Sequence, residues 1–71
     1  MKHNMHIHSG LSLGDGVRIA SALGIEVRKP TRTGEVLFSH PLHGTVRHSV
    51  RRKDASRALV VLLRRAARRS A

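Results

Sequence analysis

A cluster of basic residues and two histidines are the side chains of this sequence that are best suited to chemistry. The cluster consists of Arg51, Arg52 and Lys53, with Arg57 a few residues later. It stands just ahead of an apolar segment, so it is either the solvated approach to a helix or a phosphate site at the helix N-terminus. Helix N-termini attract anions through free N–H groups, and arginine contacts phosphate with two donors at once. We expect a phosphate site, with Arg47 as a further contact.

The positive charge of the chain is high and unevenly distributed. Fourteen Lys and Arg residues against four Asp and Glu residues give a net charge of +10. The segment 47–71 holds nine basic residues and one acid, and therefore +8 of that total. Such a field raises the local concentration of polyanions. Nucleic acid is the first expected partner, with RNA slightly ahead of DNA, and an acidic protein or an anionic membrane surface is the alternative.

The aromatic content limits the way in which nucleic acid could be read. Single-stranded RNA is commonly recognised by stacking bases on aromatic rings. Phe38 is the only Phe, Tyr or Trp residue in the chain, and strand alternation could equally place it in the core. The composition therefore favours recognition of the phosphate backbone and of duplex shape, with modest sequence specificity.

Length and composition exclude several other classes of protein. With 71 residues there is room for one small domain with a marginal core, which a homodimer would enlarge. We expect no cofactor in so small a domain. The sequence has no cysteine, which fits a cytoplasmic protein. Its longest strongly apolar run, 58–63, is far shorter than the roughly 20 residues that cross a bilayer.

The apolar periodicity predicts a helix, three strands and a second helix. The first helix has a stripe at spacings of three and four and ends at Gly24, and Pro and Gly residues separate the alternating segments that follow. The predicted elements are a helix from near Asp15 to Gly24, capped by Asp15 or Ser12, strands over 25–29, 35–40 and 45–50, and a final helix after an Asp54 N-cap. The fold class is α+β, with an antiparallel three-stranded sheet buried on one face under both helices.

The final helix has the clearest pattern. Its apolar positions follow one another at alternating offsets of three and one, which is typical of a single helical face. The predicted stripe is Ala55, Ala58, Leu59, Leu62, Leu63, Ala66 and Ala67. We expect this stripe to pack on the sheet.

Residues 1–11 are predicted to be a flexible, histidine-rich tail, and residues 12–71 a single domain. The tail has no apolar periodicity. Its His3, His6 and His8 are ligands that suit transition metals, but no carboxylate or thiolate accompanies them. We therefore expect no metal site.

The order of elements, the size and the basic cluster at the last helix resemble the double-stranded RNA-binding domain and the small HicA-type toxins of toxin–antitoxin systems. The resemblance covers roughly 15–69. In the RNA-binding domains, lysines at the start of the last helix grip phosphates across a groove. The resemblance implies this role for Arg51, Arg52, Lys53 and Arg57, and an antitoxin-like partner for the toxin alternative.

The toxins are ribonucleases with one catalytic histidine, usually in a Gly-Ser-His stretch at the start of the second strand. The corresponding place here reads Thr33-Gly34-Glu35, without a histidine. His40 or His48 could substitute, because an imidazole can act as general base on a ribose hydroxyl. The leading expectation is a nucleic-acid-binding module that is not an enzyme. The alternative is a metal-independent endoribonuclease whose histidine is displaced.

Overall fold

The computed structural model describes residues 7–28, 32 and 34–70, which form two helices and a three-stranded sheet in the predicted order α-β-β-β-α. The elements are α1 (Leu13–Ala22), β1 (Glu26–Arg28), β2 (Glu35–His40), β3 (Gly44–Ser49) and α2 (Arg57–Ser70). The α+β fold class is confirmed. The second strand has its predicted bounds, whereas β3 begins and ends one residue earlier than predicted.

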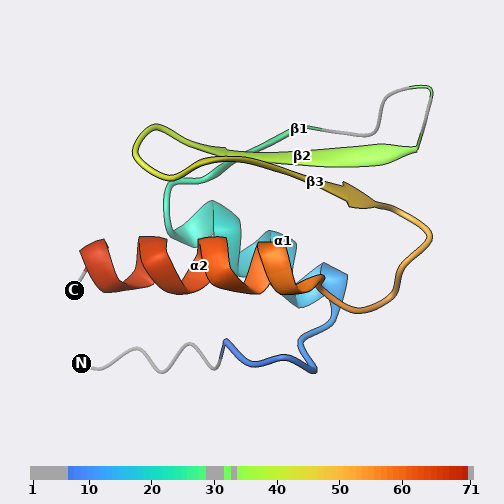
Figure 1. Cartoon of the computed structure of the whole chain (residues 1–71), viewed down its shortest axis with the longest axis horizontal. Helices are drawn as coiled ribbons and strands as arrows, with labels where there is room; N and C mark the ends of the chain where they lie inside the picture. Colours follow the sequence, from blue (N-terminus) through green and yellow to red (C-terminus); the bar gives the residue numbers. More distant parts are fainter. Residues whose placement is uncertain (1–6, 29–31, 33, 71) are drawn as a thin grey trace.

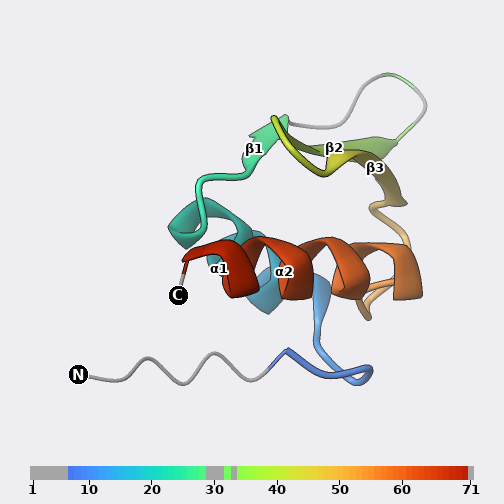
Figure 2. The same ribbon diagram turned by 60° about the vertical axis from the view of Figure 1, so that its left-hand side comes forward.

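The sheet is antiparallel with the order β1-β2-β3, and both helices lie on the same face of it (Figure 1). Figure 2, turned by 60°, shows the same two layers. In the register, Phe38 of the central strand lies between Val27 of β1 and Val46 of β3. Because side chains alternate along a strand, these three point toward the helices, and their neighbours in sequence point to the open face.

The hydrophobic core lies between the sheet and the two helices. Its largest fully buried side chains are Phe38 from β2 and Leu59 and Leu63 from α2. The other buried apolar residues are Leu11, Ala20, Ile25, Val36, Ala55, Val60, Leu62 and Ala66. Most of the predicted stripe is therefore buried, but Ala58 is exposed and Ala67 is half-buried, and Val60, outside the predicted stripe, is buried as well.

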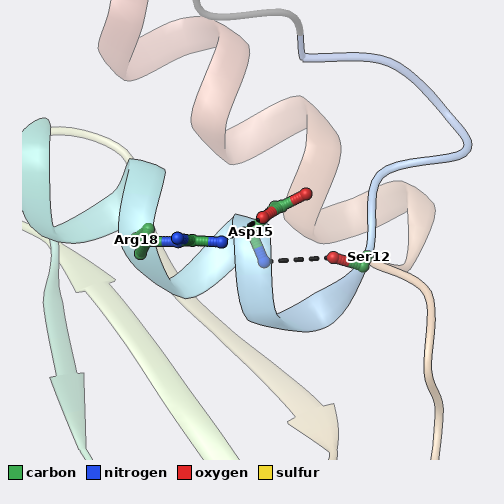
Figure 3. Close-up of polar contacts among 3 residues, drawn as sticks. All are labelled: Ser12, Asp15 and Arg18. Carbon is green, nitrogen blue, oxygen red and sulfur yellow. Dashed lines mark hydrogen bonds and ion pairs between the residues drawn. The ribbon is translucent and has the colours of Figure 1, made fainter.

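The first helix begins two residues before the predicted start, because Ser12 caps it. The Ser12 Oγ accepts a hydrogen bond from the Asp15 backbone N–H at 3.1 Å, and the Asp15 carboxylate pairs with Arg18 at 2.6 Å (Figure 3). Of the two caps that the sequence left open, the structure uses Ser12. The helix ends at Ala22, and Gly24, with φ +78°, takes the left-handed conformation that terminates helices.

Gly16 lets the two helices approach each other. It is buried, and a Cβ at this position would lie 3.3 Å from a methyl carbon of Leu59 on α2. No neighbouring atom lies within 4 Å of the position of a Cβ at Gly14. The two glycines of the first turn therefore differ: a side chain at Gly16 would press on Leu59, and one at Gly14 would meet no neighbouring atom.

The predicted Asp54 N-cap of the second helix is wrong. The helix begins at Arg57, and Ser56 is its cap: the Ser56 Oγ accepts from the Leu59 N–H at 3.2 Å, and the Ser56 carbonyl accepts from the Val60 N–H at 3.0 Å. Asp54 instead forms an isolated antiparallel bridge with Ser12. The apolar periodicity extended to Ala55 because that residue is buried outside the helix.

The predicted boundary between tail and domain also needs correction. Leu11, assigned to the tail, is a core residue with 5% exposure, and Ile7 packs against the core. The Ile7 carbonyl accepts a hydrogen bond from the Arg64 Nε at 3.0 Å. Residues 7–11 thus lie along α2 as part of the domain. The rest of the predicted tail lies outside the described residues.

Candidate nucleic-acid interface

Four of the five predicted phosphate-binding residues lie at one end of the molecule. Arg51, Arg52 and Lys53 are in the connection between β3 and α2, and Arg57 is the first residue of α2. All four are exposed. The ion pairs within the described part of the chain are Arg18 with Asp15 and Arg28 with Glu26, so these four cations are not neutralised there.

Hydrogen bonds to the sheet fix the first half of this connection. The Val50 N–H donates to the Gly34 carbonyl at 2.9 Å, which joins the connection to the residue before β2. The Arg51 N–H donates to the Ser49 Oγ at 3.1 Å, and the Arg52 N–H to the Ser49 carbonyl at 3.3 Å. The two arginines therefore extend from a turn whose backbone is held in place.

Hydrogen bonds to the start of α1 fix the second half. The Leu13 N–H donates to the Lys53 carbonyl, and the Ala55 N–H to the Leu11 carbonyl, both at 2.7 Å. With the bridge between Ser12 and Asp54, they form a short antiparallel pairing of 11–13 with 53–55. We call it the clasp. It brings the starts of α1 and α2 side by side, and the helices run in the same direction (Figure 1), so the positive ends of both dipoles lie near the basic connection.

His48, one of the two catalytic candidates, is buried beside this connection with 3% exposure. Its Nε2 accepts a hydrogen bond from the Ser56 N–H at 2.9 Å, and its Nδ1 lies 2.9 Å from the Ser49 carbonyl. Because Nε2 accepts, the proton belongs on Nδ1, which donates to Ser49. The ring also meets Phe38 edge-on, with centroids 6.5 Å apart. Both nitrogens are engaged, so His48 has no lone pair available to a substrate.

His40, the other catalytic candidate, lies at the opposite end of the sheet. Its Nδ1 accepts from the Leu42 N–H at 3.0 Å, and its ring stacks on His43 with centroids 4.7 Å apart. It is the last residue of β2, whereas the basic connection adjoins the first, Glu35. Five residues of strand separate these ends by about 17 Å. The fold therefore does not bring His40 to the predicted phosphate ligands.

Arg47 is also separated from the cluster. It lies opposite Leu37 in the register, and Leu37 lies opposite Arg28 on the other edge. These three positions alternate with the core residues, so they form a row on the open face of the sheet. Arg57, in contrast, belongs to the helix layer on the other face. Arg47 is exposed, but it does not share a surface with Arg57.

Arg32, which is not among the predicted site residues, lies close in sequence to Gly34, a residue that contacts the basic connection. Arg32 is exposed in the turn between β1 and β2, two residues before the Gly34 carbonyl that accepts from Val50. The sequence showed only that Arg32 is a basic residue in a segment whose composition is typical of turns. The hydrogen bond between Val50 and Gly34 follows from the pairing of β2 with β3, which local sequence does not specify.

The described residues contain no group of three or more His, Cys, Asp or Glu side chains placed to hold a metal ion. Within the same residues, neither helix has the length and hydrophobicity needed to span a bilayer. Comparisons with protein-family models, with curated proteins and with solved structures found no match for this chain.

Proposed function

We propose that this protein binds nucleic acid through its phosphate backbone, using Arg51, Arg52, Lys53 and Arg57. The observation that carries the proposal is the state of the basic connection between β3 and α2. Its cations are exposed and not paired within the described chain, while its backbone is held by β2, β3 and the clasp. A fixed backbone lowers the entropy lost on binding, because less of the site must be ordered.

The chemistry of the site favours phosphate over base edges as the ligand. Three arginines and a lysine supply N–H donors and no acceptor; donors alone can bind guanine O6 and N7, but distinguishing all four base pairs also needs acceptors. The ring most suited to stacking, Phe38, is fully buried. The proposal is therefore backbone and shape recognition, and duplex RNA is favoured because its wide minor groove and regular phosphates are read in that way.

The experiment is a fluorescence anisotropy titration with labelled duplex RNA, duplex DNA and single-stranded RNA of equal length. Each titration is repeated at several salt concentrations, and the length of the RNA is checked in the same samples. We expect the duplexes to bind, with RNA ahead of DNA, with affinity that depends little on sequence and falls steeply with salt. The RNA should remain intact.

Three results would count against the proposal. Absence of binding to any nucleic acid at low salt would exclude it. Strong dependence on base sequence would mean that base edges are read. RNA cleavage that the His40→Ala change abolishes would restore the ribonuclease alternative.

A further inference from the structure

A groove of about 590 Å³ runs along α2 beside the N-terminal segment. It is lined by Ser9, Arg52, Ala55, Arg57, Val60, Val61 and Arg64. The wall formed by residues 7–11 is held on α2 by the hydrogen bond from Arg64 to the Ile7 carbonyl and by the buried Leu11. Phosphate binding at the basic connection does not by itself account for a groove that extends two turns along the helix.

The helical part of this groove is a face of α2 that adjoins the core face and shares with it Val60, which is 4% exposed. Arg57, Val60, Val61 and Arg64 follow one another at offsets of three, one and three, so they lie in one stripe. The arginines stand at its two ends, about 10 Å apart along the helix axis. The valines lie between them, and Val61 keeps 37% of its surface exposed. The stripe is apolar in the middle and cationic at both ends.

We propose that this groove is a docking site for an acidic protein segment in which aliphatic side chains lie between carboxylates. The carboxylates pair with Arg57 and Arg64, and the aliphatic side chains cover the exposed part of Val61. The complementarity of charge is pronounced, since the groove contains three arginines and no acid. Arginine is also the cation best suited to carboxylate pairs at interfaces, because it offers two parallel donors.

The floor of the groove favours a peptide over a nucleotide. Its apolar residues, Ala55, Val60 and Val61, are all aliphatic. The groove residues include no aromatic ring on which a base could stack, whereas leucine and isoleucine side chains pack well on valine. Because Arg52 and Arg57 also belong to the proposed phosphate site, such a segment would displace nucleic acid. This competition rests on the proposed function, but the docking itself does not.

The test uses two short fluorescein-labelled peptides. In one, two leucines lie between pairs of glutamates, and in the other each leucine is replaced by serine. The full chain should bind the leucine peptide about tenfold more tightly, because only this peptide covers the apolar surface of Val61. The Val61→Ser change should remove that advantage, and Arg64→Ala should weaken both peptides. Arg65→Ala, an equal loss of charge at an exposed position outside the groove, is the matched control and should have little effect.

Methyl NMR spectra of the full chain then locate the peptide, and we expect the Val60 and Val61 signals to shift. Equal affinity for the two peptides, or an unchanged advantage in Val61→Ser, would overturn the docking site and leave only a diffuse positive field. Weakening of duplex RNA by Val61→Ser as large as that of the peptide would assign the groove to nucleic acid instead. If the leucine peptide binds and no nucleic acid does, the proposed function fails while the docking site stands.

Discussion

The Nε2 of His48 accepts a hydrogen bond from the backbone N–H of Ser56 at 2.9 Å, which fastens the end of the sheet to the residue that caps α2. A helix N-terminus leaves its first N–H groups without partners inside the helix. At α2, the cap residue's own N–H finds a partner in a buried imidazole. The same histidine therefore links β3 to the residue at the end of the basic connection, where the last helix begins.

This bond gives the first prediction. Replacing His48 with Phe fills the buried space but leaves the Ser56 N–H without an acceptor, which should lower the free energy of unfolding by about 1–3 kcal/mol. His48→Gln offers an amide oxygen near the position of Nε2 and should lose less. Urea denaturation followed by circular dichroism measures both. A Phe variant as stable as the wild type would mean that the bond contributes nothing.

The second prediction compares the two residues that the sequence and the structure name as the cap of α2. Ser56→Ala removes the acceptor for the Leu59 N–H and should cost about 1 kcal/mol. Asp54→Ala, at an exposed position outside the helix, should change the stability by less than about 0.5 kcal/mol. Thermal denaturation of the two variants measures both losses of stability. A larger loss of stability in Asp54→Ala than in Ser56→Ala would show that Asp54 is the cap.

The third prediction concerns the two glycines of the first turn of α1. Gly14→Ala meets no neighbouring atom and should stabilise the protein by about 0.4–1 kcal/mol, because alanine loses less entropy on folding. Gly16→Ala must displace Leu59, from which its Cβ would lie 3.3 Å, so that gain should be cancelled or reversed. Equal stabilisation by both changes, measured by denaturation, would show that Leu59 moves away from position 16 at little cost in free energy.

The fourth prediction separates a phosphate clamp from a diffuse positive field. The double change Arg51→Ala and Arg52→Ala should weaken duplex binding evenly across sequences. It should also flatten the plot of log affinity against log salt by roughly 0.9 for each B-DNA phosphate that is no longer neutralised, with a comparable change for RNA. Both effects follow from the same anisotropy titrations.

The control for this experiment is the double change Arg65→Ala and Arg68→Ala, which removes the same charge from exposed positions farther along α2. It should leave most of the affinity and of the salt slope intact, because these residues lie toward the negative end of the helix dipole. An equal loss of affinity in the two variants would exclude a clamp.

Much of the fold was predictable because it depends on periodicity. The alternation in 35–40 gave β2 with its observed bounds, and the offsets of three and one gave the core face of α2. The errors occur where tertiary contacts decide. The sequence predicted Ala55 as part of the last helix and Leu11 as part of the tail. In the structure both are buried, and both belong to the clasp and to no helix. No local pattern distinguishes a helix cap such as Ser56 from a neighbouring polar residue such as Asp54.

Less of the candidate site was predictable. The run 51–53 was visible as a charge cluster, and so was its place before the last helix. The alternation of side chains along β3 places Arg47 on the open face of the sheet, and the whole length of β2 separates His40 from the cluster. Conversely, the pairing of β2 with β3 joins Gly34, the residue before β2, to the basic connection. These relations depend on strand register, which a sequence specifies only through the fold as a whole.

The clasp also bears on the order in which the chain acquires its native structure. Pairing 11–13 with 53–55 encloses α1 and the entire sheet between the paired segments. Closing so long a loop costs entropy before the paired segments can stabilise each other, so pairings of this kind form late in folding. The hairpin of β2 and β3 needs only a short turn and can form first. We therefore expect the basic connection to reach its final shape in the last step of folding. A chain in which only the hairpin of β2 and β3 has formed would carry the arginines but would not hold them in their native positions.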